Sequence, residues 1–264
     1  MPDFHVITPA DHADKSWRPS PGYGFAARDT IAALVMQEIP RACLCLPVAF
    51  ALTDDHYMPV AVQGLAQGQN LLVGADGRWL ADYIPAVYRG YPFALARTND
   101  DQTVLCFDHD SGLLQAGAAQ GDSQPFFDAQ NQPVERLRQI LQFLSQVQAN
   151  LPATQALCAA LRQHDLIEPW AINIQGEDGQ TTTLQGLFRV SETALNTLPA
   201  DAFQALRESG ALPLVYCQLL SMQHLQRLGA LARAQAARAE ALPQSPAGDL
   251  DLEFLNSGGT IKFH

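Results

Sequence analysis

The chain has 264 residues, of which 47% are hydrophobic and 16% are charged, and its formal net charge is −11. These values are typical of a globular protein that can bury a substantial core. The acidic balance argues against a nucleic-acid partner, because proteins that bind phosphate backbones gather Lys and Arg on one face. No apolar run approaches the ~18 residues of a membrane span, and the first residues lack the basic and apolar regions of a secretory signal. The sequence therefore predicts a cytoplasmic protein without a membrane span.

The first 110 residues divide into an irregular segment and a β-rich segment. Residues 1–40 are expected to be irregular, because Pro19-Ser20-Pro21-Gly22 interrupts any early element. Residues 41–110 contain short apolar runs separated by turn sequences such as Asp54-Asp55 and Asp76-Gly77. We expect these runs to form an antiparallel sheet, with strands at 43–52, 58–64, 70–73 and 102–107.

Residues 133–240 are expected to be rich in helix, after a polar loop at 111–132. Pro133 suits the first turn of a helix, where its missing N–H costs nothing. The apolar residues that follow recur at the 3.6-residue helical period and form one stripe. We expect this stripe to be buried as the main contact between helix and sheet, through Leu137, Ile140, Leu141, Leu144 and Val147.

Three shorter helices and one long helix are expected further along the chain. The short helices lie at 153–163, 192–197 and 199–209, and Gly210 ends the last of them in a left-handed cap. Ser221 is expected to cap the long final helix, which ends near residue 240.

Two further segments have the pattern of strands. Residues 170–175 and 181–190 predict a hairpin around the turn sequence Gly176-Glu177-Asp178-Gly179. Residues 212–220 are almost wholly apolar and are expected to form one more strand.

The last residues form a linker and a tail. Residues 243–248 are rich in Pro, Ser and Gly, and residues 249–264 follow as the tail. Leu250, Leu252 and Phe254 alternate with acidic residues, which is the period of an extended strand. We expect the tail to add to a sheet edge of its own chain or of a neighbour, which would make a homo-oligomer. The alternative is a frayed terminus.

One segment, residues 78–97, combines one Trp, three Tyr, one Phe, two Pro and three Arg. Two interpretations of this segment are open. These large residues bridge two layers of the fold, or they form a recognition surface in which aromatic rings stack on a ligand and an Arg binds an anion. The residues expected on such a surface are Trp79, Tyr83, Tyr91 and Arg89, with Gln67 and Asn70 as further hydrogen-bonding residues. Asn70 also suits a turn.

Asp108-His109-Asp110 follows an expected strand, where both carboxylates would point to one side. They could bind a hard cation or share a proton. The alternative is a turn in which the carboxylates accept local N–H groups. No further ligand stands at a recognisable spacing, and we expect no metal and no cofactor. The five Cys are scattered among apolar residues, which predicts reduced, buried thiols.

Several motifs of the chain resemble those of one family. The pattern W-x-x-x-Y-I-P-x-x-x-R-x-Y-P-F at residues 79–93 is similar to a motif of the bacterial SapC family. Further segments are similar to SapC motifs, namely residues 12–17, 38–50, 64–71, 108–111 and 186–225. In the second of these, Leu46 stands where Phe is usual. The resemblance covers about residues 8–230 and implies no established chemistry.

These observations predict an α+β protein, with a mainly antiparallel sheet, helices packed on one side and an extended carboxyl-terminal tail. We expect three parts, namely residues 1–40, a SapC-like domain at 41–240, and the linker and tail at 243–264. The function expected is that of a non-catalytic binding or accessory protein for a peptide, a partner protein or a small ligand. The alternative is an enzyme that gathers four residues around one pocket, namely Asp108, Asp110, Arg89 and Tyr83.

Overall fold

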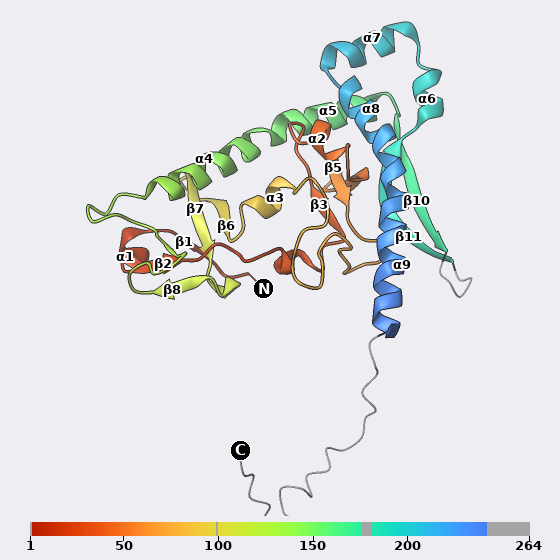
Figure 1. The fold of residues 1–264 in the computed structure, drawn as a ribbon. Coiled ribbons are helices and arrows are strands. Elements are labelled where there is room, and N and C mark those ends of the chain that lie inside the picture. The colour runs from red at the N-terminus through yellow and green to blue at the C-terminus, as the bar shows by residue number, and fades with distance from the viewer. Residues whose placement is uncertain (1, 99, 176–180, 242–264) are drawn as a thin grey trace, which may run out of the picture.

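The structure is a computed structural model that describes residues 2–98, 100–175 and 181–241 (Figure 1). Every strand pair in these residues is antiparallel, and helices lie against the strands, so the expected α+β class is confirmed. The strands of the described residues form three sheets. None of the helices in the described ranges is long and apolar enough to cross a membrane.

The largest sheet has the strand order β10-β11-β4-β5-β3. Asp54 and Asp55 both have positive φ angles, of 48° and 63°, and form the expected tight turn between β4 and β5. The hairpin expected from strands at 170–175 and 181–190 is also present, although its first strand begins earlier, at Ile167, and its turn residues lie outside the described residues. The strands are β3 (Ile31–Ala33), β4 (Val48–Thr53), β5 (His56–Val62), β10 (Ile167–Gln175) and β11 (Thr181–Val190).

Two smaller sheets lie beside the first, with the orders β1-β7-β6 and β8-β2-β9. The expectation that residues 1–40 are irregular is wrong. Their strands β1, β2 and β3 each join a different sheet. Non-local pairing partners provide the hydrogen bonds that hold these three-residue strands. The strands are β1 (Phe4–Val6), β2 (Lys15–Trp17), β6 (Phe93–Arg97), β7 (Thr103–Asp108), β8 (Leu114–Ala116) and β9 (Gln124–Pro125).

The first helices connect the sheets. Figure 1 shows α4 and α5 in line along one side of the molecule, where α4 packs on β6 and α5 on β5. The short elements are α1 (Pro9–His12), η1 (Gly24–Ala26), α2 (Ile39–Ala42), α3 (Ala86–Arg89) and η2 (His109–Ser111), and the long helices are α4 (Glu135–Ala149) and α5 (Leu151–Gln163).

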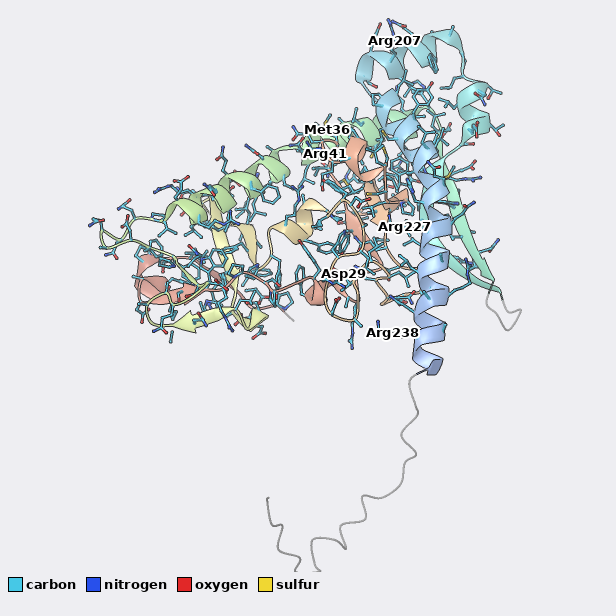
Figure 2. All side chains as sticks on the ribbon, viewed as in Figure 1. Asp29, Met36, Arg41, Arg207, Arg227 and Arg238 are labelled. Atoms are coloured by element: carbon cyan, nitrogen blue, oxygen red, sulfur yellow. The ribbon has the colours of Figure 1, made fainter. Side chains whose placement is uncertain are left out.

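The carboxyl-terminal helices lie against the largest sheet, and α8 contacts both β4 and β11. Figure 2 shows that the arginines Arg41, Arg207, Arg227 and Arg238 are spread over α2, α7 and α9. The elements are α6 (Glu192–Asn196), α7 (Ala200–Ser209), α8 (Leu212–Ser221), η3 (Met222–His224) and α9 (Leu225–Ala241). Gly210 has a φ of 77° and ends α7 as expected.

The expected strand at 212–220 is wrong, because these residues form the helix α8. Pro213 stands in its first turn, where a missing N–H costs nothing. The segment is apolar on nearly all sides, so its hydrophobic pattern could not separate a helix from a buried strand. Ser221 also does not cap the long final helix, because α9 begins only at Leu225. Ser221 ends α8, and its hydroxyl accepts the N–H of Val48 at 2.9 Å.

Of two other expected strands, one is shorter than expected and one is absent. The strand expected at 43–52 begins only at Val48, because residues before it form α2 and a turn. Pro40 in the first turn of α2 favours the helix there. Residues 70–73 form no strand, and only Val73 pairs, with Trp79 across the turn that contains Gly77.

Three hydrophobic clusters are found in the described residues, and the two largest hold these layers together. The larger lies between the five-stranded sheet, α5 and α8, and its fully buried residues include Phe50, Leu161 and Val215. The smaller is rich in aromatic residues and lies under α4, where Leu137 is 4% exposed. The stripe of α4 is buried only in part. Ile140, Leu144 and Val147 are half-buried, while Leu141 is exposed, contrary to expectation.

We predict that Leu137→Ala lowers the free energy of unfolding by about 2–5 kcal/mol, since it removes a buried side chain from the smaller core. Leu141→Ala, on the same helix, is the matched control. It is expected to cost less than about 1 kcal/mol, because its side chain is already 38% exposed in the folded protein. Urea unfolding measures both values. Equal losses would show that α4 packs with a different face inward.

Candidate functional site

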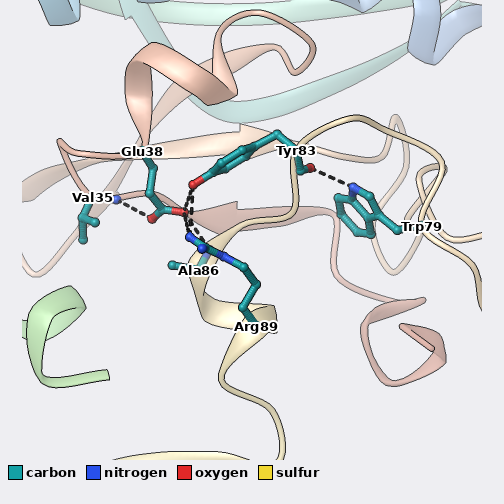
Figure 3. Close-up of polar contacts among 6 residues, drawn as sticks. All are labelled: Val35, Glu38, Trp79, Tyr83, Ala86 and Arg89. Atoms are coloured by element: carbon teal, nitrogen blue, oxygen red, sulfur yellow. Dashed lines mark hydrogen bonds and ion pairs between the residues drawn. The ribbon is translucent and has the colours of Figure 1, made fainter. Parts of the chain in front are cut away.

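A buried carboxylate organises the aromatic segment. Glu38, which precedes α2, is 5% exposed, and both of its oxygens accept hydrogen bonds (Figure 3). Its Oε2 accepts the N–H of Val35 at 3.0 Å. Its Oε1 accepts the Tyr83 hydroxyl at 2.8 Å and the N–H of Ala86, at the start of α3, at 2.6 Å. Several donors therefore compensate the desolvation of this carboxylate.

Three of the expected binding residues belong to this cluster. The indole N–H of Trp79 donates to the Tyr83 carbonyl at 2.8 Å. Arg89 lies 3.8 Å from Glu38, and its guanidinium stands over the ring of Phe143 on α4 at 4.9 Å. The anion next to Arg89 is thus a carboxylate of the chain itself, and Trp79 and Tyr83 contact the larger core. These contacts correspond to the bridging interpretation of the segment.

The Tyr83 hydroxyl acts as a hydrogen-bond donor in this cluster. Burial raises the pKa of Tyr83 well above its usual range, and the hydrogen bond to Glu38 raises it further. The phenol therefore stays protonated at neutral pH. A tyrosine with this pKa is unsuited to act as a base.

A second buried network contains Asn70. Its amide donates to the Ala26 carbonyl and to Oε1 of Gln63, each at 2.9 Å, and its Oδ1 accepts the N–H of Leu72 at 3.0 Å. The Tyr88 hydroxyl donates to the same Gln63 oxygen at 2.8 Å. Asn70 is 4% exposed and shapes the turn that carries the following residues. Gln67 lies apart from this network, on an exposed turn.

Tyr91 takes a different position, in the wall of a cleft. Its ring stacks on Phe25 with a centroid distance of 3.7 Å and an interplanar angle of 13°. The cleft has a volume of about 530 Å³ and is lined by Ser20, Pro21, Gly22, Gly24, Phe25, Asp76, Gly77, Tyr91, Ser111 and Leu113. Burial raises the pKa of Tyr91, and the charge of Asp108 adds to this effect.

The cleft continues into a second depression of about 700 Å³, because both share Ser20, Pro21 and Leu113. The second depression is also lined by Arg18, Pro19, Gly121, Asp122 and Gln124. We refer to these two adjoining depressions together as the groove.

One glycine allows the cleft floor to form. A Cβ on Gly22 would lie 2.6 Å from the carbonyl oxygen of Gly77, which also accepts the N–H of Tyr23 at 2.7 Å. The segment before η1 therefore packs directly on the turn at Gly77. Any side chain at position 22 would separate these two segments.

The two aspartates lie elsewhere. Asp108 is 5% exposed and accepts the N–H groups of Asp3 at 2.9 Å and Asp110 at 3.1 Å. It thus caps η2, which is the turn interpretation of this motif. Asp110 is exposed. Tyr83 and Arg89 gather at Glu38 instead, and within the described residues no group of three or more His, Cys, Asp or Glu could hold a metal ion.

The sequence interpretation missed several residues of the site. Glu38 was noted only as part of a family motif. Its partners Tyr83 and Ala86 are 45 and 48 positions away in the chain, so no local sequence pattern could predict these hydrogen bonds. Phe25 stands in no regular pattern. The Pro19-Ser20-Pro21 run indicated a break in secondary structure, and such a break can also be the wall of a cleft.

We predict that Glu38→Ala lowers the free energy of unfolding by about 3 kcal/mol or more, because it removes the acceptor of two backbone amides and one phenol. Arg89→Ala is expected to cost less than about 1 kcal/mol, since its side chain is 41% exposed. The exposed neighbour Gln37→Ala serves as the control. Chemical denaturation tests the order, and a loss for Arg89→Ala equal to that for Glu38→Ala would contradict it.

Comparison with models of known protein families matches residues 7–228 to SapC. Searches of curated proteins and of solved structures found no match. The matched residues include Glu38, the aromatic segment and both walls of the cleft. Because the match covers most of the 264 residues, the chain belongs to the SapC family.

Proposed function

We propose that this SapC-family protein is a non-catalytic binding protein that holds an extended peptide segment of a partner protein in the groove beside Tyr91. The observation that carries the proposal is the stacked pair of Phe25 and Tyr91 in the wall of a groove that continues past Pro21. Rigid aromatic rings contribute contact area at a small entropic cost. A groove made of two adjoining depressions suits an extended chain better than a compact ligand.

The polar groups of the groove also suit a peptide. The Ser20 hydroxyl donates to the Gly22 carbonyl and can still accept a peptide N–H. The Ser111 hydroxyl accepts the N–H of Leu113 and can still donate to a peptide carbonyl. Arg18 and Asp122 give the far end charges of both signs. Such a mixture of apolar walls and a few polar groups is common in recognition sites.

The ionisable residues of the groove favour binding over catalysis. The hydrogen bonds that Asp76 accepts from the Arg78 backbone and side chain hold the pKa of Asp76 below its usual range. It is thus a weak base at neutral pH, and Tyr91 remains protonated because its pKa is raised. No His or Cys stands among the groove-lining residues named above. The alternative enzyme receives less support, because Asp108 caps η2 while Arg89 contacts Glu38.

Site-specific photo-crosslinking tests the groove. With p-benzoylphenylalanine at the exposed position Pro21, we expect a discrete protein adduct in host cells, and mass spectrometry should identify one peptide segment. The same group at the exposed Gln67, outside the groove, is the control. Equal adducts at both positions, no adduct at Pro21, or an adduct with a small molecule would contradict the proposal.

A variant that fills the groove tests how strongly the crosslinking yield depends on this site. Gly24→Phe is expected to lower the yield of this adduct at least about tenfold, because blocking an aromatic anchor site costs about 2 kcal/mol or more of binding. A Cβ at Gly24 meets no atom within 4 Å, so the fold should accept the new side chain. Ala27→Phe, at an exposed position just after η1, is the matched control. Similar yields for both variants would remove the groove from the binding site.

A second contact is proposed for the tail, residues 243–264, which lie outside the described residues. We infer from their alternating pattern that the tail adds to a sheet edge of a neighbouring copy, because an isolated two-strand ribbon is marginal in water. Deleting these residues is then expected to convert an oligomer into a monomer in size-exclusion chromatography with light scattering. An unchanged mass and melting temperature would refute this contact.

A further inference from the structure

Three histidines from β1, α1 and η2 lie next to one another. The Nε2 atoms of His12 on α1 and His109 on η2 are 3.1 Å apart. His5 on β1 stacks on His109 with a ring-centroid distance of 4.1 Å, and Phe126 meets His12 edge-on at 5.0 Å. His12 is fully buried. One hydrogen bond between two imidazoles thus joins α1 to η2.

The backbone determines the protonation state of this pair. Nδ1 of His12 accepts the N–H of Thr8 at 3.4 Å, so this nitrogen carries no proton. His12 is then the Nε2–H tautomer and donates to Nε2 of His109. A proton on Nδ1 of His12 would oppose the Thr8 N–H, and a proton on Nε2 of His109 would break the bond between the rings.

The surroundings also disfavour a positive charge. Burial lowers the pKa of His12, and His109 and Lys15 lower it further, while a backbone hydrogen bond at Thr8 and the charge of Asp11 act in the opposite direction. Burial likewise lowers the pKa of His109, together with His5 and Lys15, against Asp3 and Asp108. Since both folded-state pKa values lie below the ordinary 6.5, the stability of the pair is complete above that pH and is lost as the pH falls below it.

The pair joins two segments of the chain that continue into the groove lining. His12 precedes β2, which leads into Arg18 and Pro21. His109 begins η2, whose last residue, Ser111, also lines the groove. The backbone N–H of Arg18 also donates to the Leu113 carbonyl at 3.0 Å, so a second hydrogen bond links the same two segments.

We propose that the hydrogen bond between His12 and His109 is an acid-sensitive latch, and that proton uptake separates α1 from η2 and releases the peptide segment from the groove. The inference rests on the proposed function for the release, but the latch itself depends only on the contacts above. Peptide binding in the groove would then be regulated by pH, in the range below the ordinary histidine pKa.

Hydrogen exchange of the purified full chain tests the latch. Between about pH 7.4 and about pH 5.5, after correction for intrinsic rates, the amides of η2 and β8 should lose protection by up to about tenfold for each titrating histidine. His109→Gln should weaken this pH dependence, since glutamine does not titrate there. His12→Gln gives the same test if the first variant folds poorly. His56→Gln, which changes an exposed histidine at the β4–β5 turn, should behave as the unmodified chain does.

Crosslinking through the benzoylphenylalanine at Pro21, in host lysates at the same two pH values, measures release. The yield should fall on acidification in the unmodified and His56→Gln chains, and less in His109→Gln. Exchange that is independent of pH, or equally dependent in His109→Gln, would overturn the latch and leave the binding proposal standing. Acid-dependent exchange with a constant yield would overturn the regulation. Acid-dependent exchange without any adduct would overturn the binding proposal and leave the latch.

Discussion

The aromatic segment depends on one buried carboxylate. Glu38 accepts hydrogen bonds from the segment before α2, from the first residue of α3 and from Tyr83. A buried charge is tolerated only where donors replace its water, so these groups must be in place together. The consequence extends to α4, because Arg89 contacts both Glu38 and Phe143. This carboxylate therefore fixes the route of the chain toward Tyr91.

The groove results from that route. Once α3 is in place, Tyr91 stacks on Phe25, and the close approach of Gly22 to Gly77 holds the opposite segment against the same floor. The family motif at residues 79–93 thus has two physical roles. Its first part, with Trp79 and Tyr83, packs and orients, and its last part presents an aromatic ring at the surface. Binding residues are often placed on loops by a rigid framework in this way.

The amino-terminal segment connects the framework to the proposed regulation. Its strands enter all three sheets of the described residues, so a change at α1 can reach several layers. The histidine pair lies where that segment meets η2. Buried imidazoles are well suited to a pH response, because their charged form loses hydration without gaining a partner. Arg18 and Ser111 line the groove and follow His12 and His109 in the chain, so the proposed latch would couple proton uptake to binding.

The sequence by itself determined the elements with strong local signals. The helical period after Pro133, the turn at Asp54-Asp55 and the cap at Gly210 each depend on residues a few positions apart, and the family motifs are equally local. Only the tertiary structure decided the rest. Residues 212–220 are apolar on nearly every side, so packing against β4 and β11 selected the helix. Glu38 with Tyr83, Phe25 with Tyr91 and His12 with His109 are distant in the chain, and no local period records which distant residues will meet.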